Sequence, residues 1–167
     1  MKHFASIILL LLSFQTSIAQ TPSKEKHNSI EGIITEFLDQ ITIVKGEKMD
    51  TSLIRNLFIP SAQFAILNHG DSSYVETVSL DEFLILLMDP YYEEGYEERE
   101  ISKVVDEYNG IAQVFQSFYG KDSEGNEERG ITSYQLVKVD NRWWIVNLLW
   151  TLESDNLKIP DKYIDDN

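Results

Sequence analysis

The spacing of apolar residues changes near residue 97, and this change most constrains the fold. Before residue 90, outside the segment 61–78, apolar side chains recur at offsets of three and four, which is the period of an amphipathic helix. From residue 97 onward they recur at about every second position, in four runs separated by turn residues. The sequence therefore predicts an α+β domain, in which N-terminal helices pack on a sheet built mainly from the C-terminal half.

Three helices are predicted, over residues 28–46, 50–58 and 79–89. In the first, Asn28 is the expected N-cap, Val44 the last apolar residue of the stripe, and Lys45-Gly46 the stop. The third has the clearest start, because Ser79 and Glu82 have the spacing of a capping box. Asp89-Pro90 is expected to end it, since the residue before a proline avoids the α region.

Six strands are predicted. The first two, at 61–68 and 72–78, form a hairpin around His69-Gly70-Asp71. The other four, at 97–108, 110–120, 129–139 and 142–153, are joined by Asn109-Gly110, the loop 121–128 and Asp140-Asn141. Because these connections are short, we expect an antiparallel meander.

The last strand is apolar on both faces if it alternates strictly. Trp143, Ile145 and Leu149 would face one way, and the next residues along, including Trp144 and Trp150, the other. We therefore expect both faces of the sheet to be covered. The helices cover one face; a second copy of the chain, giving a homodimer through the outer sheet face, or the C-terminal tail (residues 154–167) would cover the other.

The first nineteen residues have the pattern of a secretory signal peptide. Lys2 is followed by an apolar run from Phe4 to Leu12, and Ser17-Ile18-Ala19 is a small-residue cleavage site before Gln20. We expect residues 1–19 to be removed, 20–27 to be a flexible segment, 28–153 to be the domain, and the product to be periplasmic or secreted. No later run is long enough to span a membrane.

Composition excludes several classes of function. The net charge of −14 argues against nucleic acid as a partner. The absence of cysteine excludes a disulfide scaffold, a zinc ribbon and a thiol nucleophile. No metal or cofactor is expected, because His69 is the only histidine within the predicted domain and phosphate-loop motifs are missing. The acidic loop 122–128 lacks the spacing of a calcium loop and is interpreted as a hairpin.

The closing run Asp140-Asn-Arg-Trp-Trp-Ile-Val-Asn-Leu-Leu-Trp150 and the tail Ile159-Pro-Asp-Lys-Tyr163 carry a resemblance. Together with the order of elements over residues 28–153, they resemble the NTF2-like (cystatin-like α+β barrel) superfamily, in particular its exported SnoaL-like and ketosteroid-isomerase-like members. The resemblance implies three N-terminal helices packed on a curved antiparallel sheet that wraps around the long helix, with a conical pocket open at one end. Members include isomerases, dehydratases and plain binding modules, so the fold does not decide the function.

Asp106 and His69 are the candidate catalytic residues, as a carboxylate in an apolar pocket and as a base near neutrality. Each also has a plainer interpretation, as a solvated strand end and as an exposed hairpin tip. The segment 91–100, rich in tyrosine and glutamate, is either an aromatic lid or an acidic connector. The candidate pocket residues are Tyr92, Tyr96, Tyr108, Gln113, Tyr134 and Trp150.

The function expected from these observations is the binding of a small, largely apolar molecule in the cone. One alternative is an isomerase or dehydratase that uses a pocket Asp or His with a tyrosine donor. Another is a protein-interaction module with a filled pocket, which would expose a large apolar patch.

Overall fold

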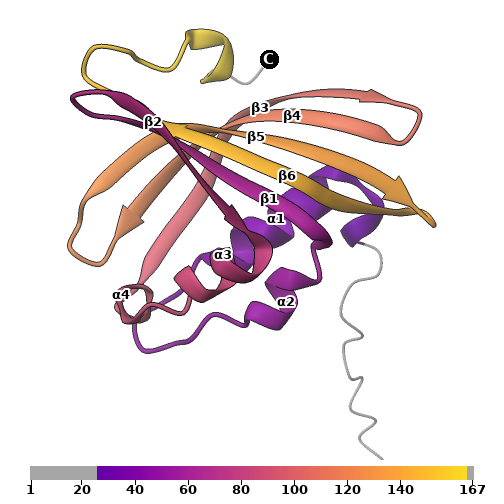
Figure 1. Cartoon of the computed structure of the whole chain (residues 1–167), viewed down its shortest axis with the longest axis horizontal. Coiled ribbons are helices and arrows are strands. Elements are labelled where there is room, and N and C mark those ends of the chain that lie inside the picture. The colour runs from indigo at the N-terminus through magenta and orange to yellow at the C-terminus, as the bar shows by residue number, and fades with distance from the viewer. Residues whose placement is uncertain (1–25, 165–167) are drawn as a thin grey trace, which may run out of the picture.

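Six strands form one sheet, and the α-helices lie together on one side of it (Figure 1). The computed structural model describes residues 26–164, so the expected signal peptide and most of the segment 20–27 lie outside the described residues. The sheet order is β2-β1-β6-β5-β4-β3. The strands are β1 (Phe58–His69), β2 (Ser73–Ser79), β3 (Tyr96–Tyr108), β4 (Ile111–Asp122), β5 (Glu127–Val139) and β6 (Arg142–Leu152).

The sheet is mixed, and the expectation of an antiparallel sheet was wrong at one junction. The hairpin β1–β2 and the meander β3–β6 are antiparallel, but β1 and β6 pair in parallel. After β2 the chain crosses through helices to the far edge of the sheet and returns one strand at a time. The final strand therefore arrives beside β1 running in the same direction, a long-range pairing that no local signal announces.

The first helix, α1 (Ile30–Ile41), is shorter than predicted at both ends. Its N-cap is Ser29, whose side chain accepts from the amide of Gly32, and not Asn28. It stops at Ile41 because Ile43 pairs with Tyr96 in a β-bridge, with N–H···O distances of 2.7 and 3.0 Å. Val44 is consequently 62% exposed instead of continuing the apolar stripe.

The other helices are short, and there is one more than predicted within the described residues. They are α2 (Thr51–Arg55), α3 (Leu80–Leu86) and α4 (Pro90–Glu93), with single 3-10 turns η1 (Lys26–Asn28) and η2 (Asp161–Tyr163) near the two ends. The capping box of Ser79 and Glu82 is confirmed at the start of α3. α3 ends at Leu86, before the predicted stop at Asp89-Pro90. Pro90 instead begins α4, where Asp89 is the N-cap and proline suits the first helical position.

The tight turns of the meander are confirmed. Asn109 and Gly110 have φ of 48° and 83°, and Asp140 and Asn141 have φ of 50° and 63°, as a type I′ hairpin requires. In the acidic loop, the Asp122 carboxylate accepts hydrogen bonds from the amides of residues 124 and 126, which closes the β4–β5 hairpin. No group of three His, Cys, Asp or Glu residues in the described chain is placed to hold a metal ion.

The core lies between α1 and the concave face of the sheet. The apolar stripe of α1 is buried, and Phe37 at its centre makes edge-to-face contacts with Phe58 at 5.4 Å and Tyr134 at 6.3 Å between ring centroids. Phe64 and Phe83 stack at 4.1 Å, which fixes α3 against β1. Edge-to-face and offset-stacked ring pairs add to the stability that burial alone supplies.

β6 does not alternate strictly as predicted, because it contains a bulge. The register shifts between Gln135 and Leu136, where Leu136 pairs with Ile145 but Gln135 pairs with Asn147. Trp143 and Ile145 therefore face the core before the bulge, and Leu148 does so after it. A bulge places two residues opposite one, so the side chains beyond it change faces.

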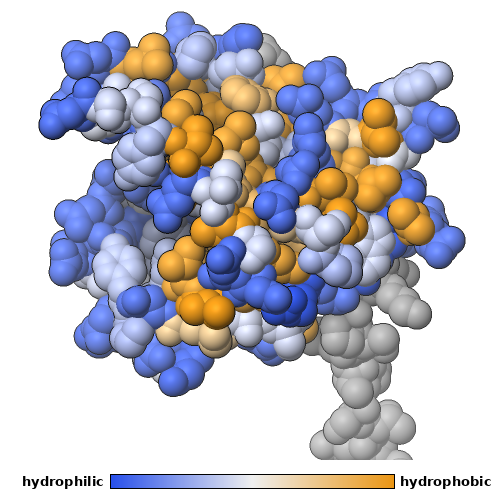
Figure 2. All heavy atoms as spheres, in the orientation of Figure 1, coloured by the Kyte–Doolittle hydropathy of each residue, from blue (hydrophilic) through white to orange (hydrophobic). Residues whose placement is uncertain are grey.

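The C-terminal tail covers part of the outer face. The Tyr163 ring lies 5.0 Å from that of Phe115, and the hydroxyl of Ser117 donates to the carbonyl of Tyr163. Other outer-face side chains stay open: Ile111 is 62% and Leu149 47% exposed. Apolar patches interrupt the polar surface where strands and α3 reach it (Figure 2). Within residues 26–164, no helix is long and apolar enough to cross a membrane.

Gly130 is the point of closest approach inside the sheet, and we expect Gly130→Ala to destabilise the fold. A Cβ there would lie 2.4 Å from the carbonyl oxygen of Thr151 and 2.7 Å from the Phe118 ring. Relieving such overlap costs about 1–3 kcal/mol. Urea unfolding measures this loss. Gly70→Ala is the control, because its Cβ would meet nothing closer than 4.0 Å; equal effects of the two substitutions would contradict the prediction.

Candidate functional site

A pocket opens at the end of the concave face, beyond the last turn of α1. Its volume is about 280 Å³. The walls come from α1, α3, the α4 segment and strands β3 to β6, whose arrangement Figure 1 shows. The surface is hollowed beside α4 (Figure 2). Aromatic and aliphatic side chains make up most of the lining, which consists of Phe37, Ile41, Met49, Phe83, Leu87, Tyr91, Tyr92, Tyr96, Glu98, Phe118, Glu128, Thr132, Tyr134, Leu148 and Trp150.

Gly120 creates part of this space. It lies between Glu98 of β3 and Glu128 of β5 in one row across three strands. A Cβ at position 120 would lie 3.0 Å from the Tyr96 hydroxyl oxygen and 3.3 Å from Glu128 Oε1. Because Gly120 has no side chain, the Tyr96 phenol and the Glu128 carboxyl group can both lie over β4, one from each neighbouring strand.

Three tyrosines form the wall on the α4 side. Neighbouring rings are nearly perpendicular: Tyr91 and Tyr92 meet at 82° and 5.4 Å, Tyr92 and Tyr96 at 87° and 5.7 Å. The Tyr91 hydroxyl donates to the Asp122 carboxylate at 2.7 Å, which ties α4 to the β4–β5 hairpin. This hydrogen bond raises the pKa of Tyr91 to about 12 and lowers that of Asp122 to about 2.

Glu98 is the most perturbed acid of the pocket. Burial raises its pKa to about 7, the charge of Glu128 adds to the rise, and the hydrogen bond that it accepts from Tyr96 at 2.8 Å opposes it. Burial also raises the pKa of Glu128 and of Tyr96. A carboxyl group that exchanges its proton near pH 7 is common at functional sites, because it can both bind charge and transfer a proton.

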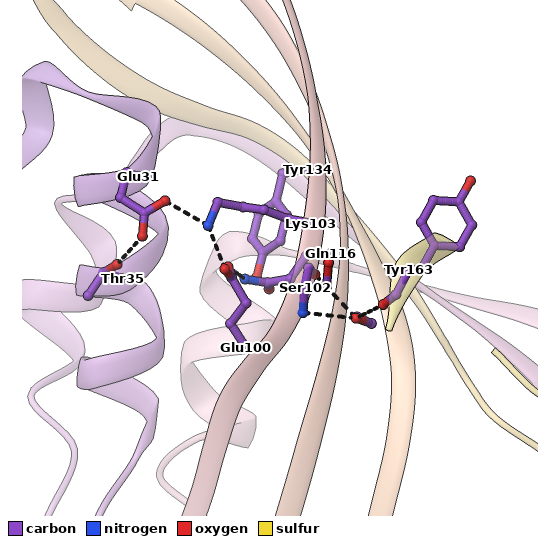
Figure 3. Close-up of polar contacts among 9 residues, drawn as sticks. Glu31, Thr35, Glu100, Ser102, Lys103, Gln116, Tyr134 and Tyr163 are labelled. Atoms are coloured by element: carbon purple, nitrogen blue, oxygen red, sulfur yellow. Dashed lines mark hydrogen bonds and ion pairs between the residues drawn. The ribbon is translucent and has the colours of Figure 1, made fainter. Parts of the chain in front are cut away.

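A chain of polar contacts holds the floor of the pocket in place (Figure 3). The buried Tyr134 hydroxyl donates to Gln116 Oε1 at 3.0 Å, and Gln116 Nε2 donates to Glu100 at 2.6 Å. Lys103 then pairs with Glu100 at 2.5 Å and with Glu31 of α1 at 2.6 Å. The chain therefore links the fully buried tyrosine to the first turn of the helix and neutralises Glu100.

Four of the six candidate pocket residues lie together in this pocket: Tyr92, Tyr96, Tyr134 and Trp150. Tyr108 and Gln113 do not lie in the pocket. They stand on the outer side of the sheet, at the ends of β3 and β4 that are farthest from the pocket. They line a separate depression of about 540 Å³ together with Asp106, and Tyr108 is 79% exposed.

The two candidate catalytic residues lie outside the pocket. Asp106 is exposed near the β3–β4 turn. His69 is exposed at the end of β1, where its Nδ1 lies 2.9 Å from the Ser73 hydroxyl.

Sequence reasoning missed the two carboxyl groups that the pocket does contain, Glu98 and Glu128. Glu98 falls within the segment 91–100. The lid interpretation applied to this segment as a whole and did not single out Glu98. Alternation places Tyr96 and Glu98 on one face of β3, and this was the available signal. Nothing local identifies Glu128, which comes near Glu98 only through the register of two hairpins.

Solved structures show the fold. An NTF2-like protein with a cystatin-like fold from Novosphingobium aromaticivorans matches with a TM-score of 0.61 and 11% identity, over 78% of this chain and 84% of that one. A protein with a domain of unknown function and a cystatin-like fold from Nostoc punctiforme matches at 0.56 and 13%, over 79% and 80%. A candidate ketosteroid isomerase from Shewanella frigidimarina matches at 0.53 and 17%, over 72% and 92%.

The chain therefore has the NTF2-like, α+β fold. No protein-family model and no curated protein matches the sequence. Identities below one fifth establish shared architecture and leave the activity to be argued from the site itself.

We expect the free energy of unfolding to decrease as the pH rises from about 4.5 to 7, because of Glu98. The folded chain holds this proton up to about pH 7 and the unfolded chain only to about 4.5, so between these values the folded state binds more protons and unfolding becomes easier as pH rises. Glu98→Gln removes this loss. We expect its stability relative to the unmodified chain to increase by up to about 3 kcal/mol from pH 4 to pH 8.

Urea unfolding at both pH values measures the effect. Glu97→Gln is the matched control, since Glu97 is exposed on the opposite face of the same strand. A Glu98→Gln effect that is the same at pH 4 and pH 8 would show that Glu98 titrates as an ordinary glutamate.

Proposed function

We propose that this chain is an exported NTF2-like domain that binds a small, largely apolar molecule in the conical pocket between α1 and the sheet. The observation that carries the proposal is a pocket of about 280 Å³ whose lining consists mostly of aromatic and aliphatic side chains. Ligand sites are typically concave, mostly apolar and equipped with a small number of placed polar groups. Here those groups are Glu98, Glu128, Thr132 and the tyrosine hydroxyls.

Binding can be tested with the neutral dye N-phenyl-1-naphthylamine, whose fluorescence rises in apolar surroundings. We expect the dye to bind and to quench Trp150, the one tryptophan among the pocket residues. Thr132→Phe should weaken binding about tenfold, because Thr132 is buried in the pocket lining and a ring there fills the space.

Ser133→Phe is the matched control, because it adds the same ring at the next residue, on the outer face. Circular dichroism verifies that both variants fold. Equal dye affinity in both variants would place the dye outside the pocket and contradict the proposal.

A second candidate function is an isomerase or dehydratase, and one observation favours it. Glu98 has a pKa near 7 and accepts a hydrogen bond from Tyr96, so the pocket pairs a proton-transferring carboxyl group with a phenol donor. This pair would take the roles predicted for Asp106 or His69 and a tyrosine donor. The variant Glu98→Gln distinguishes the two functions. An enzyme that uses Glu98 for proton transfer would lose turnover in this variant, whereas a binding module would retain its affinity for neutral apolar ligands.

The outer face supports a further part of the proposal, a homodimer. Ile111 and Leu149 remain open on that face although the tail covers Phe115. Leu149→Asp should make the chain monomeric in analytical ultracentrifugation, while Leu157→Asp, a tail residue that is 72% exposed, should not. A monomer before any substitution would contradict the dimer.

Export rests on the N-terminal pattern of residues 1–19. Intact-mass measurement of the chain recovered from a bacterial periplasm should give an N-terminus at Gln20. Retention of the full chain in the cytoplasm would contradict this part of the proposal.

A further inference from the structure

Two carboxyl groups with no basic partner stand at one wall of the pocket. Among the described residues, no lysine, arginine or histidine lines the pocket, and none forms an ion pair with Glu98 or Glu128. Glu98 accepts a hydrogen bond from the neutral Tyr96 hydroxyl instead. A carboxylate removed from water without a cation is unfavourable, and the raised pKa of Glu98 agrees with that cost.

Glu100, on the same strand, shows what is missing at Glu98. Its carboxylate is bonded by Lys103, which also reaches Glu31, and by the amide of Gln116 (Figure 3). The same β-strand thus carries one carboxylate that the protein neutralises with its own lysine and one that it leaves facing an open cavity. Glu98 therefore lacks a cation such as Lys103, which pairs with Glu100.

Aromatic rings line the same pocket as Glu98. The Tyr92 ring stands nearly perpendicular to those of Tyr91 and Tyr96, and Phe118 and Trp150 belong to the same lining. Ring faces attract cations, and pockets walled by several aromatic rings bind ammonium groups. The rings and the carboxyl groups are independent features, and both favour a positively charged group.

We propose that the pocket ligand is an apolar molecule carrying one ammonium group, which lies against Glu98 and Glu128 while its apolar body fills the space toward Phe118 and Trp150. This inference rests on the proposed binding function and names the class of ligand. The ammonium takes the place that Lys103 has beside Glu100. The row Glu98–Gly120–Glu128 allows both carboxyl groups to reach it, because Gly120 carries no side chain.

An organic cation fits better than a metal ion. Calcium takes six to eight oxygen ligands and magnesium six. The pocket lining offers two carboxyl groups, a threonine and tyrosine hydroxyls, while most of its wall is carbon. No metal-binding group of three acidic or histidine residues occurs within the described chain.

Three probes with similar bodies and different charge test the proposal: 2-phenylethylamine, 2-phenylethanol and 3-phenylpropanoate. Affinities are measured at pH 7.5 by calorimetry, with the chain from Gln20 onward. We expect the ammonium to bind at least tenfold more tightly than the alcohol, and the carboxylate to bind more weakly than either. In the double variant Glu98→Gln/Glu128→Gln, the ammonium should come within about twofold of the alcohol, whose affinity stays unchanged.

The control is Glu97→Gln/Glu127→Gln, which removes the same charge from the neighbouring residues of the same strands. It should retain the preference for the ammonium, so a loss in both double variants would show a general effect of net charge and overturn the inference. Equal binding of ammonium and alcohol by the unmodified chain would also overturn it, and would leave the proposed apolar binding intact. Failure of all three probes and of N-phenyl-1-naphthylamine would overturn both.

Discussion

The burial of one short helix against a longer sheet determines the shape of this molecule. With 12 residues, α1 is about 18 Å long, whereas the 12 residues of β4 extend for about 40 Å. The helix cannot cover the whole concave face, so both ends of the strands are left without it. At one end the chain places α3 and α4 and forms the aromatic pocket. The depression near Tyr108 lies at the other end of the strands, on the outer side of the sheet.

The β-bridge between Ile43 and Tyr96 determines where the helix stops. It pulls the chain out of α1 one turn early and fixes the start of β3 at the same point. Tyr96 and Glu98 follow directly on that strand, so the mouth of the pocket is built at the place where helix and sheet first join. Fold and site therefore depend on the same contact.

Local sequence signals predicted the features that local chemistry decides. The Ser79–Glu82 capping box and the Asn109-Gly110 and Asp140-Asn141 turns are each fixed by residues within a few positions of one another. The α+β class followed from the change of period.

The features that depend on distant partners were not predictable in this way. The parallel pairing of β1 with β6, the early end of α1 and the bulge in β6 all arise from contacts between residues far apart in the sequence. The pocket also depends on contacts between residues that are far apart in the sequence. Tyr92 and Tyr96 were candidate pocket residues, in agreement with the lid interpretation of segment 91–100. Nothing local distinguishes Glu98 and Glu128 from exposed acidic side chains, because only the strand register brings them to the two sides of Gly120.

The tail on the outer face has a practical consequence for handling the protein. Because Ser117 and Phe115 hold Tyr163 against the back of the sheet, the described chain ends on the side away from the pocket mouth. A surface to which the chain is attached through its C-terminal end would meet the convex side of the sheet. The aromatic mouth would then face the solution, which makes this end the natural point of attachment for sensors that read ligand capture directly.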